Sequence, residues 1–77
     1  MTPDRLQALV AEILDIERVV TDDTGPETEP TWDSLAQLEI LITVEEAFGV
    51  KFTAEEIADA RSVGYIRQLI GERGSAE

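Results

Sequence analysis

The 77-residue sequence contains no cysteine and no histidine. The absence of cysteine excludes disulfide bonds and thiolate-ligated metal sites. The absence of histidine removes the commonest general base and the commonest metal ligand. Only carboxylates remain for acid–base chemistry, and no motif pairs two of them in a pocket. We therefore expect a protein that is not an enzyme.

Basic residues are also scarce: six Lys and Arg stand against seventeen Asp and Glu, a formal net charge of -11. Nucleic acids and anionic membranes attract basic surfaces, so we expect neither as a partner.

No apolar run approaches the roughly 20 residues of a membrane span. Asp4 and Arg5 precede any apolar stretch, which argues against a secretory signal. We expect a monomeric, cytoplasmic chain, and the Met1 start favours a free-standing one.

Apolar residues with helical spacing predict a first helix over residues 2–18. Thr2 is its expected N-cap, and Pro3 suits the first turn. The buried face, at i, i+3, i+4, i+7 and i+8, consists of Leu6, Leu9, Val10, Ile13 and Leu14.

The second predicted helix covers residues 33–48, with Asp33 as its N-cap and Gly49 as its stop. Its apolar residues form two stripes. The first, suited to the core, consists of Ile40, Leu41, Val44 and Phe48; the second consists of Leu35, Leu38 and Ile42. A domain this small cannot bury a helix on every side, so the second stripe is a candidate binding surface.

A Thr53-x-x-Glu56 capping box predicts a short third helix that ends near residue 59 or 60. Ser62 is the expected N-cap of a fourth helix, which Gly71 and Gly74 would end. No segment alternates with the period of a strand. The expected fold class is therefore all-α, a small bundle of three main helices and one short helix over residues 1–72. Residues 73–77 are expected to form a disordered tail.

A long acidic loop over residues 21–32 joins the first two helices, and its acidic residues imply an exposed path. Asp22, Asp23, Glu27 and Glu29 do not follow the ligand order of a calcium-binding loop, so no dedicated metal site is expected. Trp32, at the end of the loop, allows two interpretations. It could be a hydrophobic plug against the bundle, or it could contact a partner.

Asp33-Ser34-Leu35 is the segment most suggestive of chemistry. Backbone N–H groups at a helix start are unpaired, and the helix dipole is positive there. A phosphate group on Ser34 would therefore be stabilised. Asp33 could cap the helix, or it could help a modifying enzyme to position a metal ion. Taken alone, these three residues are better explained by ordinary helix capping.

The wider pattern resembles the acyl carrier proteins. Asp33-Ser34-Leu35 is followed by Glu45-Glu46-x-Phe48-Gly49, and Phe52-Thr53-x-Glu55-Glu56 resembles the start of that family's third helix. The resemblance covers roughly residues 5–70. It implies that Ser34 carries 4′-phosphopantetheine, transferred from coenzyme A by a phosphopantetheinyl transferase. The arm would supply the thiol that this chain lacks and would hold an acyl group as a thioester.

The acidic and apolar residues after Ser34 fit that role. Carboxylates that frame an apolar stripe form a surface that basic, partly apolar acyl-loading and acyl-processing enzymes could bind weakly. The expected partner-contacting residues are Asp33, Leu35, Leu38, Glu39, Ile42, Glu45 and Glu46.

Some positions depart from the family pattern. Thr31 stands where a glycine is frequent, Trp32 where a small residue is usual, and Ala36 where fatty-acid carriers often have an acidic residue. The Trp-Asp-Ser-Leu form favours a free-standing carrier of polyketide or other specialised metabolism. Two alternatives stay open: an aminoacyl or peptidyl carrier, which Asp33 and the acidity disfavour, and a small acidic adaptor without a prosthetic group.

Overall fold

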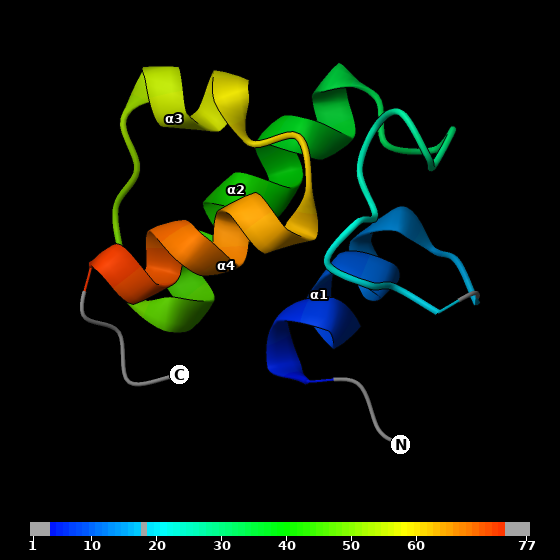
Figure 1. The fold of residues 1–77 in the computed structure, drawn as a ribbon, viewed down its shortest axis with the longest axis horizontal. Coiled ribbons are helices and arrows are strands. Elements are labelled where there is room, and N and C mark those ends of the chain that lie inside the picture. Colours follow the sequence, from blue (N-terminus) through cyan, green and yellow to red (C-terminus); the bar gives the residue numbers. More distant parts are fainter. Residues whose placement is uncertain (1–3, 18, 74–77) are drawn as a thin grey trace.

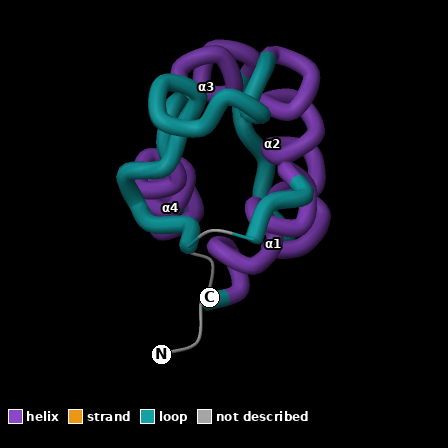
Figure 2. Tube along the Cα trace, turned by 90° about the vertical axis from the view of Figure 1, so that its right-hand side faces the viewer, coloured by secondary structure: helices purple, strands orange, loops and turns teal. Residues whose placement is uncertain are grey.

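The computed structural model describes residues 4–17 and 19–73. These residues form four helices and no strand: α1 (Arg5–Leu14), α2 (Ser34–Phe48), α3 (Ala54–Asp59) and α4 (Val63–Glu72). α1 packs against α2 and α4, while α3 packs against α2. Both views show α3 on the side of the molecule away from α1 (Figures 1 and 2). The predicted all-α class, with three main helices, one short helix and a long first connection, is confirmed.

Three helices begin at the predicted capping residues. The side chains of Asp33, Thr53 and Ser62 each accept a hydrogen bond from the backbone N–H three residues later, at 2.9–3.1 Å. Glu56 completes the predicted capping box by accepting the backbone N–H of Thr53. Gly49, with φ of 68°, ends α2 in the left-handed conformation that glycine favours.

The limits of the first helix differ from the prediction. Its N-cap is Asp4, whose carboxylate accepts the N–H of Gln7 at 2.9 Å while the Gln7 side chain accepts the N–H of Asp4. This is a capping box, and it makes the predicted Thr2 cap wrong; Thr2 and Pro3 lie outside the described residues. Asp15, with φ of 57°, ends α1 well before residue 18.

The end of the chain also differs from the prediction. Gly71 lies within α4 and does not stop it. Arg73, placed in the predicted tail, follows α4 directly, forms an ion pair with Glu56 and donates its Nε–H to the carbonyl of Lys51 at 2.9 Å. Arg73 therefore belongs to the fold. Residues 74–77 lie outside the described part of the chain, and the prediction for them stays a prediction.

The core lies where the apolar stripes of α1, α2 and α4 meet. Ile40, Leu41 and Val44 of α2 have no exposed surface, which confirms three residues of the predicted core stripe; the fourth, Phe48, is only partly buried and packs against the core. Their buried neighbours include Leu6, Val10 and Leu14 of α1 and Val63, Ile66 and Ile70 of α4. Among the described residues, no helix is both long enough and apolar enough to cross a membrane.

The connection between α1 and α2 is not uniformly exposed, contrary to the sequence prediction. Glu29 is only 3% exposed, and its carboxylate accepts the hydroxyl hydrogen of Thr31 at 3.1 Å. Trp32 is 2% exposed and belongs to the core cluster. The hydrophobic-plug reading of Trp32 is therefore confirmed, and the reading as a partner-contacting residue is wrong.

Backbone hydrogen bonds tie this connection to the start of α4. The N–H of Val63 donates to the carbonyl of Thr24, and the N–H of Gly64 donates to the carbonyl of Asp22, both at 2.9 Å. Arg67 adds an ion pair to Asp22 at 2.9 Å. The loop thus follows a fixed path to the point where α2 begins.

Candidate functional site

Ser34 is the first residue of α2 and is exposed to solvent. The preceding Asp33 is extended, and its Oδ1 atom accepts the N–H of Ala36 at 2.9 Å. Because Asp33 performs the capping, the hydroxyl of Ser34 is not needed for it. The hydroxyl lies at the positive end of a helix of 15 residues, next to N–H groups suited to an anion.

Comparison with Ser62 shows what is particular about this serine. Ser62 also lies at a helix start, but it is the N-cap of α4, is only partly exposed, and its Oγ accepts the N–H of Tyr65 at 3.1 Å. The two serines differ by one position relative to their helices. That shift leaves the hydroxyl of Ser34 available for modification, whereas modifying Ser62 would cost α4 its cap.

The predicted apolar stripe of α2 is exposed. Leu35 is 74% exposed, and Leu38 and Ile42 retain nearly half of their accessible surface. With Glu39 and Thr43 they line a shallow groove of about 290 Å³ that begins one residue beyond Ser34. Exposed leucines grouped in this way are typical of a surface that contacts a partner.

Two of the three predicted glutamates belong with this groove. Glu39 lines it, and Glu46, seven residues later, is exposed on the same side of the helix. Glu45 is placed differently: it is half-buried, and its Oε2 atom accepts the N–H of Phe52 at 2.8 Å. The structure therefore uses the Glu45 carboxylate to hold the link between α2 and α3, and does not group it with the other two.

Gln37 is a residue near the site that the sequence analysis missed. Its side chain accepts the indole N–H of Trp32 at 2.6 Å and donates to the carbonyls of Ile57 and Ala60 at 2.6 and 2.7 Å. A signal was present in the sequence, because Gln37 lies four residues before the buried Leu41 and so falls on the core side of the helix. A polar residue at such a position implies buried hydrogen-bond partners.

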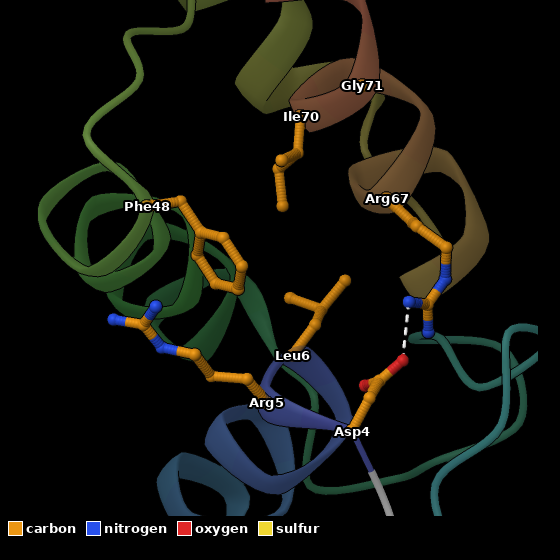
Figure 3. Close-up of a pocket in the computed structure, with 7 residues that line it drawn as sticks. All are labelled: Asp4, Arg5, Leu6, Phe48, Arg67, Ile70 and Gly71. Carbon is orange, nitrogen blue, oxygen red and sulfur yellow. Dashed lines mark hydrogen bonds and ion pairs between the residues drawn. The ribbon is translucent and has the colours of Figure 1, made fainter. Parts of the chain in front are cut away.

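A separate cavity of about 270 Å³ lies at the other end of α2, between α1 and α4 (Figure 3). Leu6, Phe48 and Ile70 supply its apolar lining, and the guanidinium of Arg5 lies 4.9 Å from the centroid of the Phe48 ring. Phe48 ends α2 and Ser34 begins it, so about 20 Å of helix at ~1.5 Å per residue separates them. The cavity is thus not part of the serine site.

One edge of this cavity is an ion-pair network. Arg67 contacts Asp4 at 2.5 Å, as the dashed line in Figure 3 marks, and it also contacts Asp22. The backbone N–H of Gln7 and the guanidinium of Arg67 hold the pKa of the Asp4 carboxyl below its usual value. The two carboxylates raise the pKa of Arg67. These charges join α1, the loop and α4.

The described residues contain no cluster of three or more acidic side chains that could hold a metal ion. The site is instead a single exposed hydroxyl at a helix start, beside an apolar groove with a carboxylate rim. Such a hydroxyl fits a covalently attached phosphate ester, because its attachment needs no pocket and leaves the Asp33 cap intact.

Comparison with known proteins agrees with this geometry. A protein-family model described as "Phosphopantetheine attachment site" matches residues 4–70, which span all four helices. Members of that family carry covalently attached 4′-phosphopantetheine. No curated protein matches the sequence closely enough to count as a relative.

Proposed function

This chain belongs to the phosphopantetheine attachment family, and from that premise we propose that it is an acyl carrier protein whose cofactor is attached at Ser34. Family membership makes it a carrier of 4′-phosphopantetheine. The proposal adds the attachment residue, the acyl cargo and the surface that partner enzymes contact.

One observation supports Ser34 above all others: its hydroxyl is exposed at the start of α2 while Asp33 supplies the cap. Esterification there disturbs no hydrogen bond among the residues that the structure describes, because the Asp33 carboxylate supplies the cap. The phosphate that results would carry negative charge at the positive end of the α2 dipole, which stabilises it. Ser62 lacks these properties because its hydroxyl is the cap of α4.

The attachment reaction is a nucleophilic substitution at phosphorus. The Oγ atom of Ser34 forms a bond to the phosphorus of coenzyme A that bears pantetheine, and the bond from that phosphorus to the adenosine bisphosphate breaks. Adenosine bisphosphate leaves, and the serine proton passes to the transferase. The attached arm supplies a thiol that forms thioesters, a group that this chain, without cysteine, does not have.

Leu35, Leu38 and Ile42, with Glu39 and Glu46, form the proposed docking face. The exposed aliphatic side chains favour contact with an apolar patch, and the carboxylates favour a basic rim around it. Exposed ion pairs contribute little free energy and are screened by salt. Such a face suits a carrier that must leave one enzyme and reach the next.

We also propose that the cargo is acyl rather than aminoacyl, and that the pathway is polyketide or other specialised metabolism rather than primary fatty-acid synthesis. The support is the Trp32-Asp33-Ser34-Leu35 segment and the net charge of -11. Isolation of the chain from its natural source with an aminoacyl or peptidyl thioester would contradict this part of the proposal and leave the carrier function intact.

Attachment is tested by intact mass after incubation with coenzyme A and a broad-specificity phosphopantetheinyl transferase. We expect the wild-type chain to gain the mass of one phosphopantetheine arm and Ser34→Ala to gain none. Ser62→Ala is the matched control, since it removes a hydroxyl from another helix start, and it should be modified like the wild type. Modification of Ser34→Ala, or none of the wild type, would contradict the proposal.

The docking face is tested with charge reversal. Glu39→Lys should slow modification at low salt, whereas Glu12→Lys, the same change at an exposed position of α1, should slow it much less. Both variants should keep the wild-type circular dichroism spectrum. Equal rates for the two variants would show that net charge, not this face, governs recognition.

A further inference from the structure

Gln37 holds the two residues that precede Ser34. Its backbone N–H donates to the carbonyl of Asp33 at 2.9 Å, which forms the first turn of α2. Its side-chain carbonyl accepts the indole N–H of Trp32 at 2.6 Å. Ser34 therefore lies within a short closed segment whose two ends are bonded to one another.

The same side chain reaches across to the end of α3. Both Gln37 donor bonds, to the carbonyls of Ile57 and Ala60, start from Nε2. These carbonyls lie at the C-terminal end of α3, and that of Ile57 also accepts the backbone N–H of Ala60 at 3.4 Å. α3 itself contributes no fully buried residue, so besides the packing of the partly buried Ile57 against the core, these two bonds hold it against α2.

The orientation of the Gln37 amide is fixed by these partners. A primary amide has two donor hydrogens and one carbonyl oxygen in a plane, and here both hydrogens and the oxygen are engaged. The Trp32 ring is anchored in turn by burial, at 2% exposure. Because the Gln37 amide is held by three hydrogen bonds, the placement of the segment that contains Ser34 depends on where the end of α3 lies.

We propose that Gln37 is a positioning residue for cofactor attachment: by joining Trp32 to the end of α3, it fixes how Ser34 is presented to the transferase. This inference rests on the proposed function. Gln37 touches neither the hydroxyl nor coenzyme A, and it acts through Trp32 and Asp33. A purely structural role would lower the melting temperature of the chain but leave the turnover of the folded protein unchanged.

The test compares Gln37→Leu with Gln68→Leu, the same substitution at an exposed position of α4. Modification is followed by mass at a temperature where both variants are folded, and kcat and KM are measured with the carrier as the varied substrate. For Gln37→Leu we expect kcat to fall about tenfold, the scale on which small misplacements act. We expect KM to stay within about twofold, because the docking face is unchanged. Gln68→Leu should match the wild type in both.

Amide hydrogen exchange gives a readout that needs no transferase. The N–H of Ala36, bonded to Asp33, should exchange faster in Gln37→Leu than in the wild type, and its rate in Gln68→Leu should not change. This comparison reports directly on the order of the serine segment.

Trp32→Phe provides a second variant in case Gln37→Leu does not fold. It keeps an aromatic ring in the core, although a smaller one, and removes the donor to Gln37, so kcat should fall in the same direction. Wild-type kcat in both variants, or a loss confined to KM, would overturn the proposal. If the wild type itself is not modified, the proposed function fails and this inference fails with it; modification of the wild type with unchanged variants refutes this inference alone.

Discussion

Replacing Gly25 by alanine tests how tightly the loop between α1 and α2 is held. Gly25 is buried, and a Cβ atom there would lie 2.1 Å from the carbonyl oxygen of Arg61. Ordinary carbon–oxygen contacts are about 3.3 Å or longer, so the two backbones would have to separate by about 1 Å. The neighbour is backbone rather than the end of a flexible side chain, so no rotamer change relieves the contact.

That separation acts on the bonds that attach the loop to α4. The bonds from Val63 to Thr24 and from Gly64 to Asp22 are both 2.9 Å long. A buried backbone group left without a partner costs about 1–3 kcal/mol, so loss of both bonds costs about 2–6 kcal/mol. One core in a chain of this size rarely supplies more than about 3–5 kcal/mol. We therefore expect Gly25→Ala to lose a large part of its free energy of unfolding, so that its urea midpoint lies far below that of the wild type.

Gly71→Ala is the matched control. A Cβ atom at Gly71 meets nothing within 4 Å, and the residue is helical, so alanine should raise the free energy of unfolding by about 0.5 kcal/mol. Urea unfolding followed by circular dichroism measures both variants against the wild type. An unfolding midpoint of Gly25→Ala equal to that of the wild type would refute the close contact with Arg61. A lower midpoint for Gly71→Ala would refute the argument that a Cβ atom fits there and that alanine favours the helix.

The remaining predictions concern charge and capping. Asp33→Ala should lower the free energy of unfolding by about 1 kcal/mol, and Asp33→Asn, which still caps, should recover most of it in thermal unfolding. Asp4→Asn should be less stable than the wild type at pH 7, because it keeps a cap but loses the ion pair to Arg67. The pKa of Asp4 is lowered in the folded state, so this difference is fully present above the ordinary value of 3.8 and should shrink as the pH falls through the folded pKa. A difference between the two unfolding curves that does not depend on pH would contradict that assignment. Added NaCl, from about 10 to 200 mM, should raise the melting temperature by screening a net charge of -11; a flat or falling melting temperature would show that the ion pairs outweigh this repulsion.

Much of the fold could be predicted from local sequence rules. Asp33, Thr53 and Ser62 each cap the helix that the sequence assigns to them, because capping depends on residues only three positions apart. The Asp4–Gln7 capping box obeys the same rule and could have been found in the sequence. The prediction placed the N-cap at Thr2 instead, because Thr2 and Pro3 also fit a helix start. The end of α1 at Asp15 has no glycine or proline to signal it.

The candidate site was predicted in its main parts. Ser34 at the start of α2, and the exposed stripe of Leu35, Leu38 and Ile42, follow from helical periodicity and from the size of the domain. The role of Glu45 could not be predicted in this way, because its partner, the N–H of Phe52, comes from the chain beyond the end of α2.

The sequence by itself thus determined where α2, α3 and α4 start, which apolar stripe of α2 stays exposed, and that Ser34 lies at the start of α2, since all of these depend on near neighbours in the chain. Only the tertiary structure decided that Glu29 and Trp32 are buried and that Gln37 joins the serine segment to α3. The physical reason is that a polar group on the core side of a helix must find its hydrogen-bond partners wherever packing places them, and the two carbonyls that accept from the Gln37 side chain lie 20 and 23 residues away.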